Sequence, residues 1–175
     1  FVNNVHYNGN GTDTIVDPYH GPIYINFVGN YWKDGPDSLP ANVTKPSIRA
    51  IGQLTYSGQA GLFVADNYGR YSTTNQNGGA ALSYGLASPD PNIINSDNGG
   101  LEIANVRYDY PQVTTTGPEQ AFNDVLAGAG AFPRDSVDAR IVAEVRNGTG
   151  HWINDPADVG GWPVLASATP PAGGG

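Results

Sequence analysis

The sequence has no cysteine, few basic residues and no long apolar segment. Without cysteine, no disulfide framework can support the fold, so a continuous hydrophobic core must do so. Eight Lys and Arg stand against 16 Asp and Glu, for a formal net charge of −8, and no basic stripe that could bind nucleic acid is present. No apolar run approaches the roughly 20 residues that a membrane span needs. We therefore expect no nucleic-acid partner and no membrane span.

Methionine is absent as well, and the chain begins with Phe1 inside a unit that recurs along the sequence. A terminus within a wall strand would leave backbone groups of that strand unpaired. We therefore expect the sequence to be the later part of a longer polypeptide. We also expect Phe1 to abut a preceding segment or another chain rather than bulk water.

The recurring unit is a short apolar run that ends in asparagine. It occurs as Phe1-Val2-Asn3-Asn4, as Phe27-Val28-Gly29-Asn30 and as Phe63-Val64-Ala65-Asp66-Asn67. The copies begin 26 and then 36 residues apart, as in solenoids whose coils share wall residues but differ in loop length. Asparagine tolerates a positive φ at a corner, and its amide can bond to the amide of the next coil. The pattern favours stacked coils over a meander of hairpins that share a Phe-Val pair.

Residues 1–110 are predicted to form these coils. The strongest strand signal lies at residues 23–28, and residues 47–51 with 61–64 are expected to build a third coil. Residues 71–100 are rich in Ser, Thr, Asn, Gly and Pro with little periodicity, which predicts a long surface loop. The 24 Gly and 14 Pro of the chain are typical of many turns and few long helices.

Residues 111–163 are predicted to form a helical cap and an anchoring segment. Pro118 in a first turn and Gly128 near the end mark one short helix. Residues 134–145 form a second helix with one apolar face, made of Val137, Ile141, Val142 and Val145. We expect these helices to cover one end of the solenoid.

Three further expectations concern the same region. Helical spacing predicts ion pairs between Arg134 and Asp138 and between Arg140 and Glu144 on its outer face. Trp162 is expected to be buried as an anchor. Residues 164–175 have the composition of a disordered tail.

The C-terminal region also carries a long and specific motif. The run AGAFPRDSVDARIVAEVRNGTG at residues 129–150, followed by DVGGWP at 158–163, resembles the C-terminal signature of bacterial pectate lyases of polysaccharide lyase family 1. The opening FVNNVHYN and the segment VGNYWKDGP at residues 28–36 are similar to successive coils of those enzymes. The resemblance spans most of the chain except residues 71–100 and the tail. It implies an all-β fold, a right-handed parallel β-helix of three sheets with an asparagine ladder, and a secreted protein.

The resemblance also implies a reaction, calcium-assisted β-elimination from polygalacturonate. In the family, the cation neutralises the uronate carboxylate, an arginine removes the C5 proton, and the glycosidic oxygen leaves C4. The catalytic arginine lies a few residues before the segment that matches Phe1, and the calcium ligands lie one to three coils earlier. The resemblance therefore implies calcium as a cofactor but gives no catalytic residue and no metal ligand in this chain.

Four residues are candidates for contact with the acidic polysaccharide. Lys33 and Arg49 would offer cations to uronate carboxylates, and Tyr31 and Trp32 would offer aromatic faces to sugar rings. The alternative is that Tyr31 and Trp32 pack in the protein and that Lys33 and Arg49 are solvated charges.

Other residue types give weaker signals. His6, His20 and His151 have no spacing typical of metal ligands, so we interpret them as structural or surface histidines. Four aspartates, Asp13, Asp17, Asp34 and Asp37, could pair for glycoside hydrolysis. Asp34 and Asp37 with backbone carbonyls could instead hold a structural calcium ion. Turn formation is the simpler interpretation for all four.

Two functions are consistent with these features. The first is the C-terminal part of a secreted pectate-lyase-like protein whose catalytic arginine and calcium ligands lie upstream of Phe1. The alternative is a non-catalytic β-helix module that binds carbohydrate or stacks on a partner chain through its N-terminal coil. In both cases this chain alone is expected to lack the catalytic residues.

Overall fold

The computed structural model describes residues 1–10, 14–18, 21–38, 47–51, 60–69, 72–76, 94–97 and 101–163. His20, the predicted tail at 164–175 and much of the segment at 71–100 lie outside these residues. The strands are β1 (Val5–Tyr7), β2 (Thr14–Val16), β3 (Ile23–Val28), β4 (Tyr31–Lys33), β5 (Ile48–Ile51), β6 (Ala60–Ala65), β7 (Asn67–Gly69), β8 (Ser72–Gln76), β9 (Ile94–Asp97) and β10 (Leu101–Ile103). The helices are α2 (Pro118–Gly128), α3 (Ser136–Asn147) and the short 3₁₀ helix η2 (Pro156–Val159).

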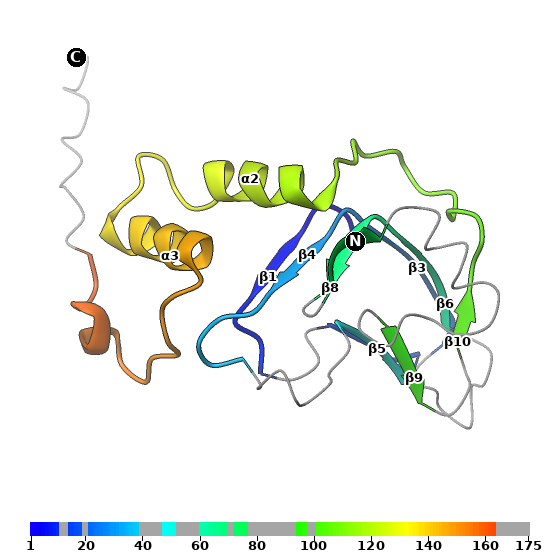
Figure 1. Cartoon of the computed structure of the whole chain (residues 1–175), viewed down its shortest axis with the longest axis horizontal. Helices are drawn as coiled ribbons and strands as arrows, with labels where there is room; N and C mark the ends of the chain where they lie inside the picture. Colours follow the sequence, from blue (N-terminus) through cyan, green and yellow to red (C-terminus); the bar gives the residue numbers. More distant parts are fainter. Residues whose placement is uncertain are drawn as a thin grey trace, which may run out of the picture.

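The strands form three sheets with the orders β1-β4-β7-β8, β10-β6-β3 and β2-β5-β9. Along the chain, strands enter the three sheets in a fixed cyclic order, and β8 is the one interruption among the described strands. Strand pairs are parallel except for the β7–β8 hairpin in the described part of the chain. Figure 1 shows the three sheets as sides around a common interior. The structure thus confirms parallel strands as the main architecture, with few helices.

One hydrophobic core lies between the three sheets. It combines side chains from β2, β3, β4, β5 and β6, namely Val16, Phe27, Trp32, Ile48, Leu62, Val64 and Ala65. Each of these side chains is at most 5% exposed. Because neighbouring residues of a strand point to opposite sides, four of these strands contribute one residue each to this interior, and the longer β6 contributes three.

The predicted asparagine ladder is confirmed. The side-chain oxygen of Asn30 accepts from Nδ2 of Asn4 at 3.1 Å, and the side-chain oxygen of Asn67 accepts from Nδ2 of Asn30 at 2.9 Å. The backbone N–H groups of Asn4 and Asn30 donate to the same two oxygens. Asn30 and Asn67 are fully buried, so these bonds satisfy polar groups that no solvent reaches.

Two details of the corner differ from the sequence prediction. The positive φ belongs to the residue before each ladder asparagine, which is Asn3 at 55°, Gly29 at 67° or Asp66 at 52°. The third copy is also shifted by one position, because Phe27 pairs with Val64 rather than with Phe63. Phe27 and Val64 are both 1% exposed, so the requirement to bury one face of the strand sets this register.

The expectation of an unbroken loop at residues 71–100 is wrong, because β8 and β9 lie within it. The backbone of β9 pairs in parallel with β5 over four positions, from Ile48 opposite Ile94 to Ile51 opposite Asp97. The sequence of β9 has no apolar alternation, so pairing with β5 forms this strand where its local sequence gives no signal.

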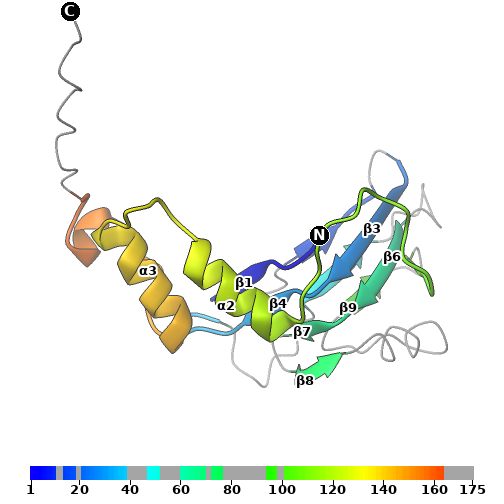
Figure 2. The same cartoon turned by 90° about the horizontal axis from the view of Figure 1, so that it is seen from above.

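The first predicted helix is confirmed as α2, with Pro118 at its start. It contacts β4 and β1, and Figure 2 shows it crossing these strands. The ring of Phe122 lies 4.8 Å from that of Tyr31, which points away from the core side of β4. α2 therefore lies along the outer face of a sheet, and the expectation that it closes the end of the stack is wrong.

The second predicted helix is confirmed as α3, which begins two residues later than expected. Asp135 caps its start by accepting from the N–H groups of Val137 and Asp138, and Gly148 ends it with φ 70°. Arg140 and Glu144 form the predicted ion pair at 2.8 Å. No residue of α3 is fully buried, and Ile141 of the predicted apolar face is 45% exposed.

Two other predictions for this region are wrong. Arg134 lies outside α3 and does not pair with Asp138; it donates instead to the carbonyl oxygens of Leu126, Ala127 and Ala129. These carbonyls lie at the C-terminal end of α2, where a cation is favoured. Trp162 is 81% exposed, so it is not the buried anchor that was expected. In the part of the chain that the structure describes, no helix is long and apolar enough to cross a membrane.

Candidate functional site

Trp32 lies inside the core and not on a saccharide-binding surface. It is 1% exposed, and its ring stacks on that of His6 at 5.7 Å between centroids. Partial burial of the His6 ring lowers the pKa of His6. This geometry favours the packing alternative for Trp32, because a sugar ring cannot reach its face without opening the core.

Lys33 points outward from β4 and is held by α3. Its Nζ donates to the carbonyl oxygens of Val145 and Arg146 at 2.7 and 2.8 Å, and it lies 5.1 Å from the ring centre of Phe122. Burial, followed by the charge of Arg146, lowers the pKa of Lys33. In this arrangement Lys33 completes the last turn of a helix, so a uronate would have to compete with those carbonyls.

Tyr31 is the third predicted residue of β4 and belongs to an aromatic cluster. Its ring lies 5.3 Å from that of Tyr68 and 4.8 Å from that of Phe122. Burial, followed by the charge of Glu119, raises the pKa of Tyr31. Tyr31 thus joins β4 to β7 and to the start of α2.

Arg49 lies in a different sheet from the other three candidates. Its backbone in β5 is in register with Ile15 of β2 and Asn95 of β9. The structure describes the position of Arg49 but not its side chain. The structure brings Tyr31 and Lys33 together under α2 and leaves Arg49 apart. A substrate role for any of them stays a prediction.

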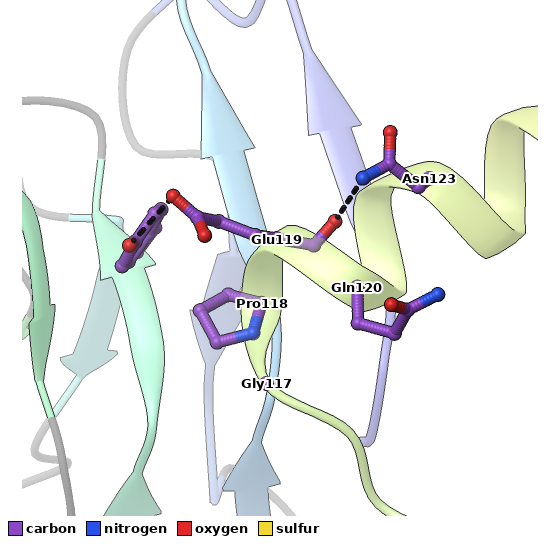
Figure 3. A pocket seen from close by; sticks show the side chains of 6 residues that line it. Gly117, Pro118, Glu119, Gln120 and Asn123 are labelled. Atoms are coloured by element: carbon purple, nitrogen blue, oxygen red, sulfur yellow. Dashed lines mark hydrogen bonds between the residues drawn. The ribbon is translucent and has the colours of Figure 1, made fainter.

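A hollow of about 300 Å³ lies beside this aromatic cluster, at the start of α2. Figure 3 shows the residues that line it, which are Tyr68, Gly117, Pro118, Glu119, Gln120 and Asn123. The hydroxyl of Tyr68 donates to Oε1 of Glu119 at 3.1 Å, and Nδ2 of Asn123 donates to the carbonyl oxygen of Glu119 at 3.0 Å. Burial, followed by the hydrogen bond to Glu119, raises the pKa of Tyr68.

The chemistry of this hollow suits hydroxyl groups better than carboxylates. Glu119 carries a negative charge, and the amides of Gln120 and Asn123 can pair with sugar hydroxyls. A uronate carboxylate beside Glu119 would meet a like charge. Sequence reasoning missed the hollow because Glu119 is a common first-turn residue of helices. The one available signal was Tyr68, which directly follows a ladder asparagine.

The described residues do not fit a calcium ion. No group of three or more His, Cys, Asp or Glu side chains gathers in the part of the chain that the structure covers. Asp37, one of the two earlier candidates, has both oxygens engaged by protein donors. Oδ1 lies 2.8 Å from Nδ1 of His151, while Oδ2 accepts from the backbone of Trp152 and the side chain of Asn8. Asp37 therefore joins the segment after α3 to the coils.

Comparisons with known proteins identify fungal relatives. Proteins named probable pectate lyase C from Neosartorya fischeri and Aspergillus fumigatus are 34% identical over 97% of this chain, and that of Aspergillus terreus is 33% identical over 98%. The chain spans only 37 to 38% of the length of these relatives, at their C-terminal part. No family model matches the chain, and no solved structure matches it significantly.

The match covers the coils with their ladder asparagines as well as the segment of α2 and α3. It was expected from the motifs at the start of the chain and at residues 129–163. The chain is therefore a relative of the pectate lyases over nearly its whole length.

Proposed function

We propose that this chain is the C-terminal part of a secreted protein that cleaves polygalacturonate by calcium-assisted β-elimination. The observation that carries the proposal is the relationship to proteins named probable pectate lyase C, which extends over 97% of the chain. The cyclic entry of strands into three sheets and the buried asparagine ladder support a right-handed parallel β-helix as the fold.

The proposal assigns the chemistry to residues upstream of Phe1, which this chain does not contain. The relatives are more than twice as long as this chain, and no cluster of metal ligands occurs among the described residues. Calcium ligands and a catalytic arginine would then come from the remainder of the protein. Within this chain, the coils and α2 would support and extend the saccharide-binding surface.

An eliminative assay tests the proposal. The complete polypeptide and the 175-residue chain are each incubated with polygalacturonate and calcium, with and without a chelator, while absorbance of unsaturated uronides is followed. We expect the complete polypeptide to be active only with calcium, and the chain alone to be inactive although circular dichroism shows it folded. Inactivity of the complete, folded polypeptide would overturn the proposed reaction. Full activity of the chain alone would overturn the placement of the catalytic residues.

A non-catalytic module remains the second candidate, on the basis of one edge of the structure. Among the described strands, β1 lies at the edge of its sheet and pairs only with β4, so its other side can accept a strand. Phe1 packs on Phe27 at 5.2 Å between ring centres but is still 44% exposed. A preceding segment or another chain that pairs with β1 would cover this edge. Analytical ultracentrifugation of the chain tests whether another copy pairs with β1. A strictly monomeric chain would contradict stacking between copies.

A further inference from the structure

The segment between β10 and α2, residues 104–117, forms a strap across the outer face of β3. Nδ2 of Asn26 donates to the carbonyl oxygen of Tyr108 at 3.0 Å, and the N–H of Tyr108 donates to Oδ1 of Asn26 at 2.9 Å. The hydroxyl of Tyr110 donates to the carbonyl oxygen of Tyr24 at 2.7 Å. Further along, Asn3 bonds to the backbone of Thr114 and Thr116. Figure 2 shows this segment running past β3 before it reaches α2. The strap is therefore held to the sheet at several points.

A hollow of about 310 Å³ opens between this strap, β3 and the first two residues of the chain. Its lining includes Phe1, Tyr24, Arg107, Tyr110 and Val113. Tyr24 and Tyr110 are 45% and 49% exposed, so their rings contribute to a surface that solvent reaches. The walls are thus largely aromatic and aliphatic, and they surround one side-chain cation, which lies near the α-amino group of Phe1.

That cation, the guanidinium of Arg107, has no protein partner in the part of the chain that the structure describes. No hydrogen bond or ion pair joins it to another described residue, although Arg107 is half-buried. Asp109, two residues further on, is exposed and forms no ion pair with it. A half-buried guanidinium without an acceptor is free to bind an anion that enters the hollow.

The shape and charge of the hollow define the ligand. A planar guanidinium pairs in a bidentate manner with a carboxylate, and exposed tyrosine rings pack on the apolar faces of sugar rings. A uronate supplies both features in one residue. The Tyr68–Glu119 hollow has the opposite charge, so a uronate carboxylate would favour Arg107 over Glu119. The site also lies on the β3 sheet, away from Tyr31 and Lys33 on β4 and from Arg49 on β5.

We propose that the hollow of Tyr24, Arg107 and Tyr110 is an accessory site that binds an unesterified galacturonate residue through its carboxylate. The choice of galacturonate among uronates rests on the proposed function, whereas the carboxylate specificity rests on Arg107 itself. Such a site would hold an acidic polysaccharide against a protein whose net charge is −8. It binds its ligand and performs no chemistry.

Calorimetric titration of the full-length protein with trigalacturonate, with calcium removed by a chelator, tests this site. Replacement of Arg107 by alanine or by glutamine should weaken binding by at least about tenfold, as expected when a charge-assisted pair of hydrogen bonds is lost. Arg146→Ala is the matched control, because Arg146 is exposed in the last turn of α3 and lies outside the hollow. We expect this control to bind like the wild type.

A second arm of the titration uses the methyl ester of trigalacturonate, which keeps the rings but removes the charge. The ester should bind at least about tenfold more weakly to the wild type, with no further loss in Arg107→Ala. Equal affinity for acid and ester, unchanged affinity in both Arg107 variants, or absence of any binding would overturn the site. The last result would indicate that polypeptide fills the hollow in the full-length protein.

The eliminative assay separates this inference from the proposed function. If the full-length protein releases no unsaturated uronides but still binds trigalacturonate through Arg107, the reaction is wrong and the site stands. If it is active and Arg107→Ala binds normally, the reaction stands and the site is wrong.

Discussion

The side-chain oxygen of Asn67 accepts two hydrogen bonds from Asn30, one from its backbone nitrogen and one from its Nδ2, each at 2.9 Å. Nδ2 of Asn30 also donates to the carbonyl oxygen of Phe1 at 3.1 Å. Both asparagines are 0% exposed. The side-chain amide of Asn30 therefore joins three successive coils of the chain. Because Asn30 is buried, water cannot replace the protein acceptors of its Nδ2 group.

Replacement of Asn30 by aspartate should destabilise the protein severely. The new carboxylate would point at two acceptor oxygens, those of Phe1 and Asn67, and would leave a charge buried without a donor there. We expect the free energy of unfolding in urea to fall by about 3 kcal/mol or more at neutral pH. The deficit should shrink on acidification, because a protonated carboxyl group regains one donor.

The matched control for this experiment is Asn154→Asp. Asn154 is exposed, and its side chain forms no hydrogen bond in the described part of the chain. Its substitution should change stability by less than about 0.5 kcal/mol. Similar losses in the two variants would contradict a special role for the ladder.

The ladder was predictable because its chemistry is local to the sequence. A short apolar run before each asparagine marks a strand end, and the amide group explains why the same residue recurs there. The register was harder, because Phe27 and Phe63 look equivalent in the sequence while Phe27 pairs with Val64. Only the burial of one strand face decides between registers that differ by one residue.

Tertiary contacts decide the features that the sequence did not predict. β9 has a polar sequence and exists through its pairing with β5. The Arg107 hollow depends on how the strap lies over β3. Nothing in the sequence around Arg107 predicts that arrangement. Lys33 was predicted from its charge to bind substrate, whereas the fold brings the end of α3 to it.

Replacement of Lys33 by methionine tests whether this residue completes α3. Methionine keeps an unbranched apolar stem beside Phe122 but cannot donate to Val145 and Arg146. We expect a loss of about 1 to 2 kcal/mol in the free energy of unfolding, because two helix-terminal carbonyls lose a charged donor. Amide hydrogen exchange should accelerate most in the last turn of α3. Arg146→Met, in the same turn, is the control; it loses only an exposed charge at the helix end, so exchange should change far less than in Lys33→Met.

The pKa of Asp37 provides a pH-dependent test of the contact between the coils and the segment after α3. Hydrogen bonds from His151, from the backbone of Trp152 and from Asn8 hold the pKa of Asp37 below its ordinary value. The stabilisation from its ionised form is therefore complete above the ordinary aspartate pKa of about 3.9 and is lost as the pH falls through the lower folded value.

His151→Ala should move the pKa of Asp37 back toward its ordinary value, since the hydrogen bond from His151 is the largest cause of the shift. The shift should be reduced and not abolished, because the donors of Trp152 and Asn8 remain. Titration of the Asp37 carboxyl carbon by NMR measures both values. Ile153→Ala is the control, because Ile153 is exposed and follows the contact. An identical titration in wild type and His151→Ala would rule out the contact in solution.

Gly61 faces the strap, and its substitution should show how tightly the strap lies on the sheet. Gly61 pairs with Tyr24 of β3, and a Cβ atom at position 61 would meet the hydroxyl of Tyr108 and lie 2.6 Å from Cδ1 of Tyr24. Gly61→Ala must therefore separate the two tyrosines, whose rings lie 5.3 Å apart, or lift Tyr108 from Asn26. We expect a loss of about 1 to 3 kcal/mol in the free energy of unfolding, as for overpacking elsewhere. Faster amide exchange at Tyr108 should accompany this loss of stability.

Gly117→Ala is the matched control, because no atom lies within 4 Å of its Cβ position. If Gly61→Ala were as stable as this control, the strap would have to lie further from β3 in solution, and the Arg107 hollow would lose one of its walls.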